Sequence, residues 1–304
     1  MELIPQTPGS GTTHLLYLLT ATAILPSSLG GKDSCVAIID TDNTFSVSRL
    51  VQQIRVAIRS HRQNQREQDQ HPPTKTEAET AEAAALIDST INSALRHVHI
   101  FRPQSQTSLL ATLASLPTYF LNNGTNPSLY RPLAFIALDS LPAFHWQTRA
   151  ESETKAFLEE ETQNQENQEK NQNPPNSTPP PKQTLPSLLQ TLAQTFPSTP
   201  HLYTNPSHFP RLSSLLQPTH QHHQHHHHHP PKPISLTLSR QTARPFPPMI
   251  SLAEALREKA QREIAVRKAR WWVGSTVPVG GREGGMMGFE VGIDGERGVW
   301  VVED

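Results

Sequence analysis

Short apolar segments alternate with longer segments of helical periodicity over the first 140 residues of the chain. The segments with strand character lie at residues 3–4, 35–40, 97–102 and 132–139, and intervening stretches such as 46–60 repeat apolar side chains at helical spacing. Strands separated by helices pair in parallel through crossover connections. The alternation therefore predicts an α/β fold with a mostly parallel central sheet and helices on both of its faces.

The second half of the chain adds elements of both kinds. Helical patterns lie at residues 185–196 and 251–272, and strand patterns lie at 201–205, 234–240, 289–293 and 299–302. The last two strand patterns flank the sequence DGERG. Because turn residues between two short apolar runs indicate a hairpin, we expect the sheet to end in a C-terminal antiparallel hairpin.

Polar and proline-rich segments interrupt this pattern. Hydrophobic residues make up only 35% of the chain, against about 45–50% in ordinary globular proteins. The 28 prolines and the Gln, Asn and His tracts are concentrated in a few segments that cannot contribute to a core. We expect one core built from residues 1–150 and 185–304, with a flexible insertion at 61–80, a disordered linker at 151–184 and a His-rich low-complexity tract at 219–233.

Charge and cysteine content exclude several classes of protein. The formal net charge of −1 gives no overall basic character, so any nucleic-acid contact would be local or made through another subunit. A single cysteine, Cys35, excludes an internal disulfide and a cysteine-based zinc site. The apolar run at 15–25 is too short to span a bilayer and lacks a basic leader, which predicts an intracellular protein with no membrane partner.

Residues 7–25, TPGSGTTHLLYLLTATAIL, place a glycine-containing loop between the first strand and a helix. The backbone N–H groups of such a loop and the positive end of the helix dipole hold phosphates in mononucleotide-binding proteins. The usual loop has Gly, four residues, then Gly-Lys-Ser/Thr. Gly11 and Thr13 fit the second glycine and the hydroxyl, but Gln6 replaces the first glycine and Thr12 replaces the lysine. The alternative is an ordinary turn before an apolar helix.

Aspartates follow two of the predicted strands. Asp40 and Asp42 come at the end of the strand at 35–40, and Asp139 follows a second apolar run. Since the carboxyl ends of parallel strands meet at one edge of a sheet, we expect these side chains to lie near the glycine loop. A carboxylate in this place holds Mg²⁺, usually through a bound water, and a second acid can orient an attacking water. Each aspartate alone is equally consistent with a turn or a helix cap.

Together these segments resemble the RecA-like recombinases, and specifically the eukaryotic recombination-repair paralogues of the X-ray repair cross-complementing (group 2) type. The resemblance covers most of residues 7–147 and is carried by GSGTTHLLYLL, VAIIDTDNTFSVSRLVQQI, HVHIFRPQSQTSLLATLASLP and RPLAFIALDSLPAFHWQ. It implies a RecA-like P-loop core, ATP and Mg²⁺ as cofactors, and a nuclear function in homologous recombination and double-strand-break repair. The implied partners are other RecA-like paralogues and single-stranded or recombination-intermediate DNA, reached directly or through the complex.

The resemblance also implies functions for individual residues. Asp139 would be the Mg²⁺ carboxylate, acting through a bound water, and Asp42 falls where active recombinases place a catalytic glutamate. The nucleotide-binding loop would consist of Gly9, Ser10, Gly11, Thr12 and Thr13, with Thr13 as a further Mg²⁺ contact.

Two departures from the family pattern bear on activity. Thr12 removes the lysine charge that neutralises the phosphates, so the sequence predicts weak or absent ATP hydrolysis and leaves ATP binding open. Asp42 is one methylene shorter than glutamate, which shortens its reach to an attacking water. The leading hypothesis is a scaffold or mediator in a paralogue complex, and the alternative is an active P-loop NTPase or small-molecule kinase. A Rossmann-type dinucleotide site is disfavoured because Gly9 and Gly11 lack the third glycine of that motif.

Overall fold

The computed structural model describes residues 1–6, 10–69, 77–122, 124, 126–166, 184–205, 209, 235–240, 249–267, 270–275, 287–294 and 298–302. Within these ranges the strands are β1 (Glu2–Pro5), β2 (Cys35–Asp40), β3 (Val98–Phe101), β4 (Leu133–Asp139), β5 (His201–Thr204), β6 (Ser235–Arg240), β7 (Arg270–Ser275), β8 (Met287–Asp294) and β9 (Gly298–Val302). The helices are α1 (Thr12–Ile24), the short η1 (Ser27–Leu29), α2 (Val47–Asp69), α3 (Glu77–Leu95), α4 (Gln106–Leu121), α5 (His145–Glu166), α6 (Leu185–Thr195) and α8 (Leu252–Arg267).

The described strands form one mixed sheet in the order β3-β2-β4-β5-β1-β6-β7-β8-β9. All pairings from β3 to β6 are parallel, and those from β6 to β9 are antiparallel. The predicted α/β fold with a mostly parallel sheet and a C-terminal antiparallel hairpin is therefore confirmed. It is the arrangement expected of a RecA-like core.

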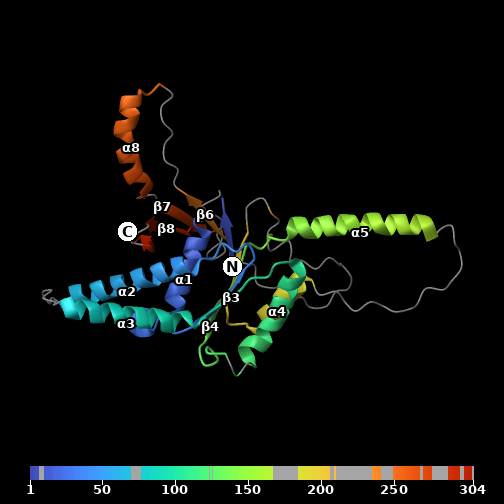
Figure 1. The fold of residues 1–304 in the computed structure, drawn as a ribbon, viewed down its shortest axis with the longest axis horizontal. Coiled ribbons are helices and arrows are strands. Elements are labelled where there is room, and N and C mark those ends of the chain that lie inside the picture. Colours follow the sequence, from blue (N-terminus) through green and yellow to red (C-terminus); the bar gives the residue numbers. More distant parts are fainter. Residues whose placement is uncertain are drawn as a thin grey trace.

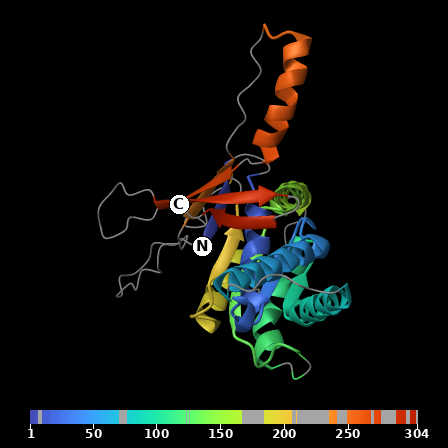
Figure 2. The ribbon, with the colours of Figure 1, turned by 90° about the vertical axis from the view of Figure 1, so that its left-hand side faces the viewer.

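Helices cover both faces of the parallel part of the sheet. Every residue of β2 is buried, and alternate side chains of a strand point to opposite faces. Val36 and Ile38 pack in one apolar cluster with residues of α1, α2 and α3. Ala37 and Ile39 pack in a second cluster with residues of α4 and α6. The continuous apolar run of β2 is thus explained by burial on two sides. Figure 2 shows the ribbon from the side, with helices packed around the strands of the core.

Helices extend into parts of the polar segments for which the sequence predicts a flexible insertion and a disordered linker. Helix α2 continues to Asp69 and α3 begins at Glu77, so helix covers both ends of the predicted insertion at 61–80. Helix α5 continues to Glu166 and so covers the first half of the predicted linker at 151–184. Glu, Gln, Arg, Lys and Ala have high helix propensity even where no apolar periodicity exists. In α5 an additional ion pair joins Arg149 and Glu153 at 2.7 Å along the exposed surface.

The predicted helix at 251–272 is too long by several residues. Helix α8 ends at Arg267, and Arg270–Ser275 forms β7, which includes Trp271 and Trp272. Tryptophan and valine favour strands, and here β7 is paired on both sides, with β6 and β8. Helices α5 and α8 both extend away from the sheet (Figure 1).

Two remaining expectations concern the rest of the chain. The His-rich tract at 219–233 lies outside the described residues. Among the helices that are described, none has the length and apolar character needed to cross a membrane.

Candidate functional site

Three aspartates meet at the carboxyl edge of the parallel strands. Asp40 ends β2 and is paired in register with Asp139, which ends β4. Asp42 lies two residues beyond β2. One carboxylate oxygen from each of the three lies within 4.8 Å of the others, and Asp40 and Asp139 are buried whereas Asp42 is exposed. The structure therefore brings together the three acids noted in the sequence, of which only Asp42 and Asp139 were assigned functions there.

Asp139 has one satisfied and one unsatisfied carboxylate oxygen. Its Oδ1 accepts a hydrogen bond of 2.7 Å from the hydroxyl of Thr204 on β5, and that hydroxyl in turn accepts the N–H of Ser140. Its Oδ2 is buried and has no hydrogen-bond partner among the described residues, while the residue as a whole is only 4% exposed. A buried polar atom without a partner is costly, so this oxygen is available to a ligand.

Burial raises the pKa of Asp139 from its ordinary value of 3.8 to about 6. The negative charges of Asp42 and Asp40 make a smaller contribution to this rise, and the hydrogen bond from Thr204 partly opposes it. A cation would remove this penalty on the charged form. Carboxylate oxygens are the ligands that Mg²⁺ prefers. The donor set and the unsatisfied oxygen therefore fit a divalent cation.

Asp40 is already engaged on both of its oxygens. Its Oδ1 accepts the N–H groups of Thr44 at 3.0 Å and Phe45 at 3.3 Å. Its Oδ2 accepts Nε of Arg102 at 3.0 Å, and Nη2 of the same guanidinium donates to the carbonyl of Phe45 at 2.9 Å. This network fixes the turn that carries Asp42.

Two residues with unusual backbone conformation follow the site carboxylates directly. Asn43 and Ser140 have φ values of 58° and 66°, in the left-handed region that residues other than glycine adopt infrequently. Asp42 itself accepts bonds from the N–H and hydroxyl of Thr44, at 3.3 Å and 2.8 Å. Such conformations cluster at functional sites, where the surrounding contacts hold them.

The glycine loop and α1 lie at the same edge of the sheet, because α1 follows the end of β1. Gly11 is the N-cap of α1, and its φ of 85° lies in the left-handed region, which glycine adopts without steric strain. Ser10 is buried, and Thr12 and Thr13 are half-buried at the start of the helix. Gly9, the remaining predicted phosphate-loop residue, lies outside the described residues.

Tyr17 joins α1 to the loop that carries Asp42. Its hydroxyl accepts the N–H of Ser46 at 2.8 Å, and its ring lies 4.8 Å from that of Phe45. The start of α1 and the aspartates are thus parts of one packed unit. In the strand order, β1 and β4 are separated only by β5.

The sequence alone did not identify Arg102, Thr204 or Tyr17. Arg102 could have been noticed in the sequence, because it is a charged residue at the carboxyl end of a predicted strand, as Asp40 and Asp139 are. Thr204 could not have been, since its contact with Asp139 depends on the β4–β5 pairing register.

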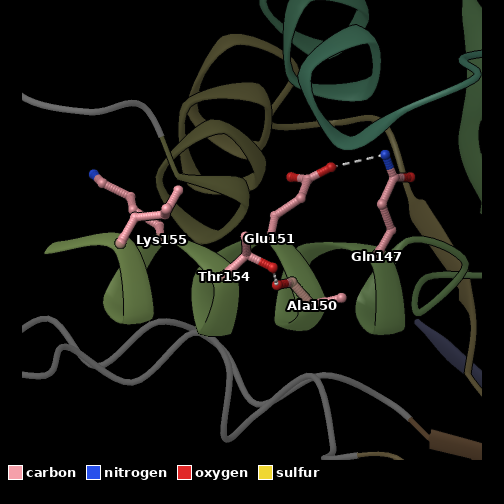
Figure 3. A pocket seen from close by; sticks show the side chains of 6 residues that line it. Gln147, Ala150, Glu151, Thr154 and Lys155 are labelled. Atoms are coloured by element: carbon pink, nitrogen blue, oxygen red, sulfur yellow. Dashed lines mark hydrogen bonds between the residues drawn. The ribbon is translucent and has the colours of Figure 1, made fainter. Parts of the chain in front are cut away.

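A shallow, open pocket of about 430 Å³ lies elsewhere, along α5. Figure 3 shows its lining side chains on one helix, with the amide of Gln147 donating to Glu151 at 2.9 Å. The lining residues are Gln147, Ala150, Glu151, Thr154, Lys155 and Leu158. None of them belongs to the predicted site, so we assign no ligand to this pocket.

Comparison with known proteins finds similarity to DNA repair proteins. The chain is 32% identical to mouse DNA repair protein XRCC2 over 154 residues, which is 51% of this chain and 44% of that relative. It is 29% identical to DNA repair protein RAD51 homolog 3 of Cricetulus griseus over 116 residues, 38% of this chain and 29% of the relative. It is 42% identical to mouse DNA repair protein RAD51 homolog 2 over 45 residues, 15% of this chain and 13% of the relative.

These matches define a distant relationship. No protein-family profile matches the chain. The chain spans less than half of the length of the curated relatives described above. About half of the chain is therefore distantly homologous to XRCC2 and the RAD51 paralogues, which are RecA-like recombinase relatives.

Proposed function

We propose that this protein is a RecA-like paralogue that acts as a scaffold or mediator in homologous recombination, with weak or no ATP hydrolysis. The observation that carries the RecA-like part of the proposal is the closeness of Asp42 and Asp139 at the carboxyl edge of a parallel sheet. It occurs in a chain whose relatives are named DNA repair proteins. The proposed location is the nucleus.

ATP and Mg²⁺ are the proposed ligands of this edge. Asp139 would hold Mg²⁺ through a bound water, with the hydroxyl of Thr13 as a further contact, and Asp42 would lie near the cation. The phosphates would lie against the backbone N–H groups at 9–13, at the positive end of α1. When bound, Mg²⁺ supplies positive charge that neutralises the phosphates.

The replacement of lysine by Thr12 is the reason to propose a scaffold rather than a motor. Lysine in this loop contributes fixed positive charge to phosphoryl transfer. Arg102, a cation at the same edge, is already hydrogen-bonded to Asp40 and to the carbonyl of Phe45. We propose that the protein binds other RecA-like paralogues, and that single-stranded or recombination-intermediate DNA is contacted directly or through the complex. The net charge of −1 is consistent with contact through the complex.

The second candidate is an active P-loop NTPase or small-molecule kinase, favoured by the closeness of Asp42 to Asp139. Phosphate release from Mg²⁺-ATP by the purified full chain separates the two functions. We expect a rate that does not differ between the wild type, Asp139→Asn and the control Asp88→Asn, which removes an exposed acid paired with Arg55. Turnover that falls on the order of 100-fold in Asp139→Asn but not in Asp88→Asn would instead establish an enzyme.

A further inference from the structure

The closeness of the three aspartates suggests a cation site with three carboxylate ligands, but their hydrogen bonds do not support it. We propose that Arg102 withdraws Asp40 from the cation, so that, of the three aspartates, Asp42 and Asp139 are the two that face it. This inference rests on the proposed function, in which this edge of the sheet binds a divalent cation. It assigns Arg102 and Asp40 as positioning residues.

The lone pairs of Asp40 are largely occupied by protein donors. A carboxylate offers about four lone-pair positions, and Asp40 accepts one bond from Thr44, one from Phe45 and one from Arg102. A metal ligand would have to lie about 2.1 Å from the cation. The guanidinium Nε is only 3.0 Å from Oδ2 of Asp40. A second cation at that carboxylate would therefore meet the positive charge of Arg102 at short range.

Arg102 is held in place although its side chain is 46% exposed. The β2–β3 register pairs Ile39 with Phe101, so the next residues of the two strands, Asp40 and Arg102, lie side by side. Two nitrogens of the planar guanidinium are bonded, one to the carboxylate and one to a backbone carbonyl. This planar fork geometry suits Arg better than Lys. The register of β2 and β3 therefore determines the ion pair between Asp40 and Arg102.

Asp139, unlike Asp40, has a carboxylate oxygen that no protein donor in the described residues occupies. Its Oδ2 is buried and without a hydrogen-bond partner in the described part of the chain. Asp42 is exposed, and both of its hydrogen bonds given above are to Thr44. With Arg102 counted, the three carboxylates and one guanidinium carry two net negative charges. That charge matches one divalent cation.

The test is Mn²⁺ binding to the full chain without nucleotide, measured by calorimetry and by the electron paramagnetic resonance of free Mn²⁺. Arg102→Gln releases the Asp40 carboxylate, and we expect Mn²⁺ to bind at least about 10-fold more tightly. The double variant Asp40→Asn/Arg102→Gln replaces the ion pair by a neutral amide pair. We expect its Mn²⁺ affinity to stay within about twofold of the wild type. The control Arg55→Gln breaks a different ion pair, with Asp88, and should change nothing.

Each other outcome overturns the inference. Unchanged or weaker Mn²⁺ binding by Arg102→Gln shows that Arg102 does not restrain Asp40. Loss of Mn²⁺ affinity in the double variant shows that Asp40 is a ligand. The double variant therefore tests whether Asp40 binds the cation even if Arg102→Gln does not fold. Mn²⁺ binding that Asp139→Asn leaves unchanged removes the proposed cation site itself, and the inference with it. If Asp139→Asn weakens Mn²⁺ binding but Arg102→Gln does not tighten it, the proposed cation site stands and only the inference about Arg102 is overturned.

Discussion

Replacing Asp139 by asparagine should stabilise the protein at neutral pH, in the absence of divalent cations, by about 2–3 kcal/mol. The wild-type carboxyl is buried beside Asp40 and Asp42, and its pKa is raised to about 6 from 3.8. Asparagine is nearly isosteric and carries no charge, so it removes the cost of the buried anion. Its side-chain oxygen can still accept the Thr204 hydroxyl.

The pH dependence of this effect has a defined sign. Because the folded-state pKa of Asp139 is above its ordinary value, the native state binds this proton more tightly than the unfolded chain does. The resulting stability is fully present below about pH 4 and is lost as the pH rises through about 6. Urea unfolding in the presence of a chelator should therefore show the advantage of Asp139→Asn growing by about 2 kcal/mol between about pH 4.5 and about pH 7.5. A variant that is less stable than the wild type at neutral pH would contradict this account.

Replacing Asp40 by alanine should have the opposite effect and cost about 2–4 kcal/mol of the free energy of unfolding. The change leaves two N–H groups, of Thr44 and Phe45, without their acceptor and Arg102 without its counter-ion. The half-exposed guanidinium can be rehydrated, which keeps the cost below that of a fully buried pair.

The matched control for Asp40→Ala is Asp42→Ala, two residues along the same loop. Asp42 is exposed, so its removal should change the free energy of unfolding by about 0.5 kcal/mol or less. Denaturant titration of the two variants provides the comparison. If Asp40→Ala and Asp42→Ala lose equal amounts of unfolding free energy, the hydrogen bonds around Asp40 do not hold the loop.

The central strands were predictable because their physical requirements are local. A strand buried on both faces must be apolar along most of its length, as at residues 35–39 of β2, and such runs are visible in the sequence. The carboxyl edge of a parallel sheet then places Asp42 and Asp139 together without further information.

Other features depend on contacts that the sequence does not display. Thr204 and Arg102 reach the aspartates only because β4 is paired with β5 and β2 with β3 in particular registers. The helical ends of the polar segments, as in α2 and α5, arise from helix propensity rather than from apolar periodicity. Low apolar content was therefore a poor indicator of missing secondary structure.

The proposed scaffold function is tested most directly by the proteins that the full-length chain binds. Affinity purification from nuclear extract after nuclease treatment, followed by mass spectrometry, identifies them without assuming an activity. We predict that other RecA-like paralogues are recovered, because their binding would be protein-mediated and would survive removal of DNA. Repeated recovery of no such paralogue, or recovery only before nuclease treatment, would contradict a direct scaffold in a paralogue complex.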